Sequence, residues 1–239
     1  MISRPLTVDL KGHPFTIRRP LTLDITVDAA PQDADTHTAR GPLFSKARAI
    51  RLCWVALLVA PCLLVAGHMG TSLNWQRVHI SYYAAKAPLG DLVTLAMALS
   101  TVAIVCMARL LPTTLRPRWW AFFLSFALCI GAAGLVTLAV YEVDVARRMH
   151  NRGLFAFFFV ATPAMILAGL TLALNKRPWS ERLCGLMASL STASGVAVYV
   201  MWSAIKLDRG VRQRLAFLLV WIAALLLLWV ISKRRTHDR

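Results

Sequence analysis

The segment Leu215–Ser232, LAFLLVWIAALLLLWVIS, contains no charged residue and is apolar on every side. A strand of a membrane β-barrel would instead alternate polar and apolar residues over about 10 positions. An uninterrupted apolar run of this kind is close to the roughly 20 residues that a helix needs to cross a bilayer. The segment therefore predicts a transmembrane α-helix.

Uncharged stretches of similar length recur upstream, at Leu52–Leu73, Leu92–Ala108, Trp119–Tyr141, Gly153–Asn175 and Leu183–Ile205. The chain is 58% hydrophobic, which exceeds what a soluble domain of 239 residues hides inside one core. We expect an all-α, polytopic membrane protein with a bundle of six transmembrane helices over residues 49–233. Residues 234–239 form a basic C-terminal tail.

Residues 1–48 differ from the rest, being polar and rich in Pro and Thr. Within them, Arg4–Leu10 (RPLTVDL) recurs as Arg19–Ile25 (RPLTLDI), and both copies alternate apolar and polar residues as a strand does. The following residues 29–42 have the composition of a flexible linker, so a hairpin would have almost no core to bury. The sequence favours a weakly ordered cytoplasmic tail, with a small β-hairpin as the alternative.

The basic residues indicate orientation and partners. More Lys and Arg fall at the helix ends that share a side with both termini, which places the N- and C-termini in the cytoplasm of a multi-pass protein of the cell (inner or plasma) membrane. The net charge of +16 is spread over helix ends and the tail, so membrane lipids are the expected partner and nucleic acid is not. A membrane-protein partner or a second copy of the chain is the alternative.

Small residues are concentrated in two of the predicted spans. The third contains Gly131 and Gly134, and the fifth contains Gly185, Ser189 and Gly195 among other Ala, Ser and Thr residues. Small residues let helix backbones approach closely, so we expect the fifth span at the bundle centre and the Leu-rich sixth span against lipid. The hydroxyls of the fifth span serve close packing or, alternatively, line a ligand path.

Titratable residues gather at the helix ends that face away from the cytoplasm in this topology, namely Asp91, Glu142, Asp144, Asp208, His68, His79 and His150. Each such group costs free energy to hold near lipid, so a cluster of them is where we expect the functional site. Arg147, Arg148 and Arg152 lie among these acids in the sequence and suit a phosphate as well as a carboxylate.

Short motifs in this region resemble a prokaryotic family of six-helix membrane proteins related to DRAM and Frag/Sfk-type proteins. The similar residues are His79-Ile80-Ser81, Ala87-Pro88-Leu89-Gly90-Asp91, Gly134-Leu135, Asp144, His150 and Gly153-Leu154-Phe155-Ala156-Phe157-Phe158. Tyr82 and Tyr83 stand where the family pattern has a glycine. The resemblance covers residues 52–232 and implies a six-helix bundle with a role related to membrane lipids.

Two functions are consistent with these residues. The first is a non-enzymatic protein whose outer vestibule binds a lipid headgroup or a partner protein; the candidate ligand-binding residues are His79, Ser81, Asp91, Asp144, Arg148 and His150. The second is an intramembrane lipid hydrolase or acyltransferase in which a His and an Asp act as acid and base. The sequence favours the first and predicts no cofactor. A zinc site formed by His79, Asp144 and His150 is the metal alternative.

Overall fold

A computed structural model of the chain describes residues 7–10, 13–16, 45–69, 71, 73–141, 146–201 and 207–233. The chain divides into two units, Met1–Arg40 and Gly41–Arg239. In the first unit, strands β1 (Thr7–Leu10) and β2 (His13–Thr16) form an antiparallel pair. β1 belongs to the first copy of the sequence repeat. The second copy, most of the predicted tail and the C-terminal residues 234–239 lie outside the described residues.

The second unit contains six helices that are long and apolar enough to cross a membrane. They are α1 (Lys46–Gly67), α3 (Gly90–Thr114), α4 (Arg118–Val140), the continuous run of α5 (Arg147–Ala156), η1 (Phe157–Ala161) and α6 (Thr162–Leu174), then α7 (Trp179–Val200) and α8 (Arg209–Lys233). A short helix, α2 (Ile80–Lys86), precedes α3. The predicted fold class is confirmed: the chain is a multi-pass membrane protein built as a bundle of six helices.

Most spans begin before their uncharged stretch does. α1, α4, α5 and α8 begin at basic residues, Lys46, Arg118, Arg147 and Arg209. Lys and Arg place their aliphatic stems along apolar surface and their charges in water, so the helix continues through them toward the membrane surface. At its other end, α1 stops at Gly67, six residues before the predicted boundary at Leu73, because the chain turns there into the segment that carries α2.

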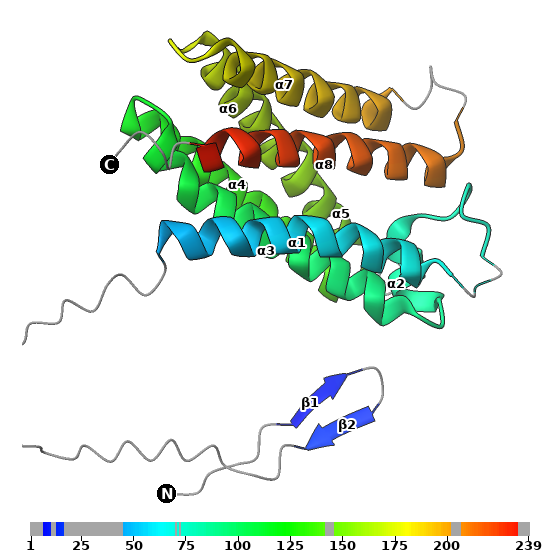
Figure 1. The fold of residues 1–239 in the computed structure, drawn as a ribbon. Coiled ribbons are helices and arrows are strands. Elements are labelled where there is room, and N and C mark those ends of the chain that lie inside the picture. Colours follow the sequence, from blue (N-terminus) through cyan, green and yellow to red (C-terminus); the bar gives the residue numbers. More distant parts are fainter. Residues whose placement is uncertain are drawn as a thin grey trace, which may run out of the picture. The chain divides into compact units, whose positions relative to one another are not determined.

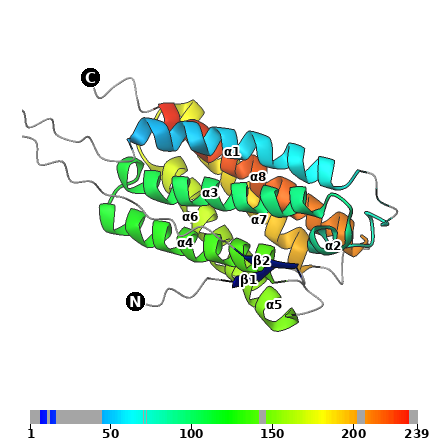
Figure 2. The ribbon, with the colours of Figure 1, turned by 90° about the horizontal axis from the view of Figure 1, so that it is seen from below.

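Successive spans run in opposite directions and pack side by side in chain order, and α8 also contacts α1, so the helices form a closed ring (Figures 1 and 2). One end of the ring contains α2, the last turns of α1, α4 and α7, and the first turns of α3, α5 and α8 (Figure 2). We call it the α2 end. The opposite end contains the α3–α4 and α6–α7 connections and is called the Arg177 end.

Glycines bring several of these helices into close contact. A Cβ on Gly134 of α4 would lie 2.7 Å from the carbonyl oxygen of Gly153 in α5, and a Cβ on Gly185 of α7 would lie 2.7 Å from that of Gly169 in α6. Ser189 Oγ of α7 also donates to the Ile166 carbonyl of α6 at 2.8 Å. The small residues of α4 and α7 thus act in close helix packing.

The predicted positions of the last two spans are wrong. α7 packs between α6 and α8 as one member of the ring and does not occupy its centre. Large side chains such as Leu186, Met187 and Leu190 are exposed on its outer face. α8 instead buries a long stripe that runs from Gly210 to Ile231. The reason is that small residues allow close approach on one face only, while the large residues between them turn the rest of α7 toward lipid.

The fourth span contains a wide turn at its middle. In η1, the N–H of Thr162 bonds to the carbonyl of Phe157, five residues earlier, and Pro163 follows without an N–H of its own. The extra residue in this turn places two successive rings, Phe157 and Phe158, in buried positions. Wide turns of this kind are often found at functional sites.

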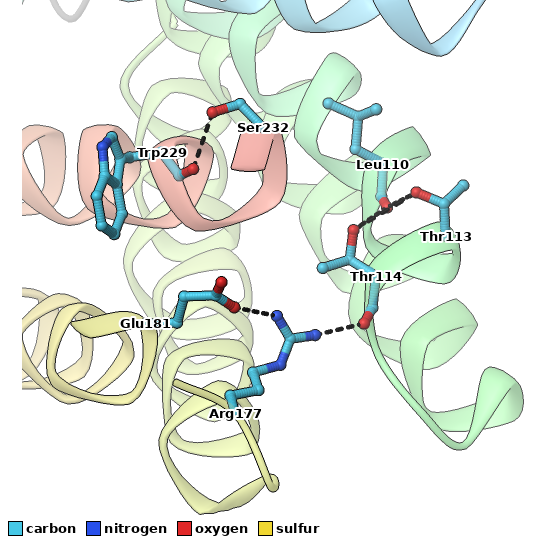
Figure 3. Close-up of polar contacts among 7 residues, drawn as sticks. All are labelled: Leu110, Thr113, Thr114, Arg177, Glu181, Trp229 and Ser232. Atoms are coloured by element: carbon cyan, nitrogen blue, oxygen red, sulfur yellow. Dashed lines mark hydrogen bonds and ion pairs between the residues drawn. The ribbon is translucent and has the colours of Figure 1, made fainter. Parts of the chain in front are cut away.

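An ion pair at the Arg177 end joins α7 and the α6–α7 connection to the end of α3 (Figure 3). Arg177, in the α6–α7 connection, donates to Glu181 of α7 at 3.0 Å and to the carbonyl of Thr114 at the end of α3 at 2.8 Å. The two charged side chains are only 7% and 15% exposed. The pair suits both helix dipoles, because the cation lies at the C-terminus of α3 and the carboxylate in the first turn of α7.

Replacing Arg177 by Ala should therefore lower the stability of the bundle. The change leaves Glu181 without this partner in a poorly hydrated position and removes a donor from the Thr114 carbonyl, at a cost of about 3 kcal/mol. Thermal unfolding of the purified protein in detergent measures the effect. Lys176→Ala, at the exposed neighbouring position, is the matched control. Equal unfolding temperatures for the two variants would contradict the structural role of the ion pair.

Candidate functional site at the α2 end

The side chain of Arg214, near the start of α8, fastens the segment between α1 and α2. Its Nη1 donates to the carbonyls of Trp75 at 2.6 Å and Val78 at 3.0 Å, and its Nη2 lies 2.7 Å from Nε2 of His68. The guanidinium also lies 5.2 Å from the centre of the Tyr83 ring in α2, a cation–π distance. One guanidinium thus links α1, α2 and α8.

These contacts determine the protonation state of His68. Its Nε2 accepts from Arg214, which has no acceptor, so the ring proton is on Nδ1, which donates to the carbonyl of Leu64. Burial lowers the pKa of His68; the bond to Leu64 opposes this effect, and the charge of Arg214 adds to it. His68 is therefore a neutral structural acceptor, and its ring packs on Tyr83 with the ring centres 4.0 Å apart.

Gln213, next to Arg214, positions the start of α2. Its Oε1 accepts from the backbone N–H of Ile80 at 2.7 Å and lies 3.3 Å from Nδ1 of His79. A carbonyl oxygen can only accept, so Nδ1 of His79 carries the proton and Nε2 retains its lone pair in the neutral ring. Gly210, one turn earlier, lets the 75–78 segment approach, because a Cβ there would collide with three of its carbonyl oxygens.

A pocket of about 300 Å³ opens beside this junction. Within the described residues, His79 from the start of α2, Tyr199 from the end of α7, and Arg209 and Arg212 from the first turns of α8 line it. We call it the basic pocket. Arg212 is only 9% exposed, whereas Arg209 is exposed. Tyr199, Arg209 and Arg212 carry N–H or O–H donors, which is a composition that suits an oxyanion.

The surrounding charges act on His79. Burial lowers the pKa of His79 most; the bond to Gln213 opposes this effect, and electrostatic interactions with Arg209, His150 and Arg212 lower the pKa further. His150, in α5, is buried, and its Nδ1 lies 3.0 Å from the carbonyl of Tyr141, so Nδ1 carries its proton as well. Both histidines are therefore bonded through Nδ1, and they interact electrostatically.

The other predicted site residues have different positions. Ser81 is buried within α2, Asp91 is exposed in the first turn of α3, and Arg148 is exposed on α5. None of these three lines the basic pocket as far as the described chain defines it. Asp144 lies outside the described residues, as does Glu142. Of the predicted set, His79 is thus the one described residue that lines the basic pocket, and His150 acts on it electrostatically.

The described residues contain no group of three or more His, Cys, Asp or Glu side chains placed to hold a metal ion. The predicted zinc alternative included Asp144, which is not among them, so that alternative stays a prediction. Two arginines beside His79 would repel a dication, which makes the pocket better suited to an anion.

Sequence reasoning missed five residues of this region, Tyr199, Arg209, Arg212, Gln213 and Arg214. A signal was present at residues 209–214 (RGVRQR), where three arginines lie directly before the most apolar run of the chain. Since residues three and four apart share a helix face, a helix that starts at Arg209 gathers Arg209, Arg212 and Gln213 on neighbouring positions. Tyr199 had no such signal, because α7 brings it to the pocket from elsewhere in the ring.

Comparison of the sequence with protein-family models and with curated proteins, and of the structure with solved structures, gives no match.

The lowered pKa values of His68 and His79 predict that acid destabilises the fold. In an unfolded chain the pKa of histidine is about 6.5, and the folded values of His68 and His79 are lower. Below about pH 6.5 the unfolded state therefore binds more protons than the folded state. The contribution of these histidines to stability is complete above this pH and is lost as the pH falls toward their lowered folded-state pKa values. Unfolding temperatures measured in detergent against pH should decline in this window.

The variant His68→Gln should flatten the decline, because an amide can accept from Arg214 without titrating. The same slope in the wild-type protein and in the variant would contradict the assignment of His68 as a neutral acceptor.

Proposed function

We propose that the protein binds the phosphate group of a membrane lipid in the basic pocket, as a non-enzymatic protein with a lipid-related role. The observation that carries this proposal is the lining itself, in which two arginines, a tyrosine and a histidine from three helices converge at the α2 end. Basic pockets between transmembrane helices at a membrane surface suit anionic lipid headgroups.

The geometry of the pocket supports a phosphate in particular. Arg209 and Arg212 are three residues apart and thus neighbours on α8, so their guanidinium groups can bind different oxygens of one phosphate. His79 keeps Nδ1 bonded to Gln213, which leaves Nε2 as an acceptor when neutral and a further donor when protonated. A pocket of about 300 Å³ is large enough for a headgroup fragment and lies at the lower end of ligand sites.

The location of the pocket follows from the proposed topology. The positive-inside rule places both termini in the cytoplasm of a cell membrane, and this puts the α2 end on the outer face. The lipid would then come from the outer leaflet. The resemblance to the DRAM and Frag/Sfk-type family, which implies a lipid-related role, supports the same proposal. A partner protein or a second copy that presents an acidic group is the competing occupant.

The first test replaces Arg212 by Gln. Charged hydrogen bonds to a phosphate contribute about 1.5–3 kcal/mol, so the affinity for phosphatidylglycerol should fall about tenfold or more. Binding is measured by native mass spectrometry on the full chain in phosphatidylcholine nanodiscs that contain increasing fractions of phosphatidylglycerol. Arg212→Lys, which keeps the charge but loses the forked geometry, should show an intermediate affinity.

Arg77→Gln is the matched control, because Arg77 is an exposed arginine at the same end that does not line the pocket. Equal loss in Arg77→Gln and Arg212→Gln would show unspecific attraction to the membrane surface and would overturn the proposed site. Competition by inorganic phosphate at comparable concentration would identify free phosphate, rather than the lipid, as the ligand. If neither phosphatidylglycerol nor phosphate bound, the proposal would be overturned in favour of the acidic partner as the occupant.

A second candidate function is a lipid hydrolase or acyltransferase that uses His79 and His150. The observation in its favour is that both rings are held through Nδ1, which leaves each Nε2 available as a base or as a metal ligand. If this function is correct, purified protein should contain stoichiometric zinc that is lost in His79→Ala and His150→Ala, or should release fatty acid from phospholipid vesicles. Metal analysis and fatty-acid release measure these outcomes, and protein without either property would exclude this candidate.

A further inference from the structure

An apolar cavity lies inside the ring of helices. Its volume is about 70 Å³, and its walls come from α1, α2, α3, α4, η1, α6 and α8. Ala96, Met97 and Met107 of α3 face it from one side, and Trp221 and Ala224 of α8 face it from the other. The cavity exists because the spans pack in chain order around a centre that no span occupies.

The lining of this cavity excludes a polar ligand. Ser100 is the one hydroxyl among the lining residues that the structure describes, and its Oγ donates to the carbonyl of Ala96 at 2.8 Å. Three methionines, Met97, Met107 and Met165, contribute flexible side chains that adapt to an irregular apolar ligand. A water needs about 10–15 Å³ on the same scale, so the space suits a run on the order of five methylene-sized groups.

A stack of aromatic rings connects this cavity to the basic pocket. Tyr199, which lines the basic pocket, stacks on Phe158 with the ring centres 4.0 Å apart. Phe158 in turn packs on Phe217 at 5.5 Å, and Phe157 stacks on Phe217 at 5.3 Å. Phe157 and Phe217 line the apolar cavity.

Consecutive residues of the chain also line the two spaces. Ile80 lines the cavity, and His79 beside it lines the basic pocket. The aromatic rings thus form a continuous series of contacts from a cationic space at one end of the bundle to an apolar space within it.

We propose that the two spaces are the two halves of one amphiphile site, in which an aliphatic chain of the lipid enters the apolar cavity while its phosphate occupies the basic pocket. This inference rests on the proposed headgroup function. The ligand class that fits is a phospholipid with a chain free to turn into the protein, such as a single-chain lysophospholipid. The rings of Phe157 and Phe217 would rotate to let the chain pass. Both rings line the apolar cavity, so they have free volume into which they can rotate.

Photo-crosslinking tests this inference on the full chain. The probe is lysophosphatidylglycerol with a diazirine at the end of its chain, bound to the protein in phosphatidylcholine nanodiscs and mapped by peptide mass spectrometry. We expect adducts on Met97 and Met107, which line the cavity. Leu95 and Val105, on the same helix, are 48% and 47% exposed on its outer face and report a chain that stays in the bilayer.

Two variants sharpen the result. Ala96→Phe fills the cavity and should abolish the adducts on Met107, whereas Leu95→Phe, the matched substitution on the lipid-facing side of α3, should leave them. Binding of water-soluble glycerophosphoglycerol should be unchanged in both variants, because it has no chain. Crosslinking of the wild-type protein keeps the inference testable if Ala96→Phe does not fold.

The outcomes separate this inference from the proposed function. Adducts confined to Leu95 and Val105, with Arg212-dependent binding of glycerophosphoglycerol intact, would overturn the chain site and leave the headgroup site standing. If neither the lysophospholipid nor glycerophosphoglycerol showed binding that depends on Arg212, both the chain site and the headgroup site would be overturned. Adducts on Met97 and Met107 that persist in Ala96→Phe would also overturn the assignment of the cavity as the place of the chain.

Discussion

The contacts of Arg214 are the constraint on which the α2 end depends. Its guanidinium is held by carbonyls of the 75–78 segment and by a neutral His68, so fixed dipoles of the protein solvate much of its charge. Together with the bonds from Gln213 to Ile80 and His79, this fixes α2 against α8. His79 lines the same pocket as Arg209 and Arg212 because the side chains of Gln213 and Arg214 hold α2 against α8.

The ring of six helices supplies the second half of the arrangement. Several spans pack on their neighbours in the chain through glycine contacts, such as that of Gly134 with Gly153, and the centre is left to side chains and free volume. The wide turn at Phe157–Ala161 directs two successive rings inward where an ordinary helix would direct one. The rings of Tyr199, Phe158, Phe217 and Phe157 connect the basic pocket to the apolar cavity, so a polar and an apolar space lie at the two ends of one series of ring contacts, which is the property that an amphiphilic ligand requires.

Much of the fold follows from the sequence because the bilayer imposes it. An apolar run near 20 residues must form a helix in lipid, since every backbone polar group has to be satisfied within the segment. The placement of the fifth and sixth spans was wrong because composition does not tell which face of a helix is covered. Ser189 and Gly185 are buried in α7, yet Leu186 and Leu190 between and beside them face outward.

The sequence by itself determined the number of spans, their alternating direction, and hence the end of the bundle at which His68, His79, His150, Asp91 and Arg212 lie. Only the tertiary structure decided which of these share a site. Helix direction sorts residues by membrane end, but lateral order around the ring and the rotation of each helix depend on packing between segments far apart in the chain. For that reason Tyr199 joins His79 and Arg212 in one pocket, while Ser81 and Asp91, closer to His79 in sequence, do not line it.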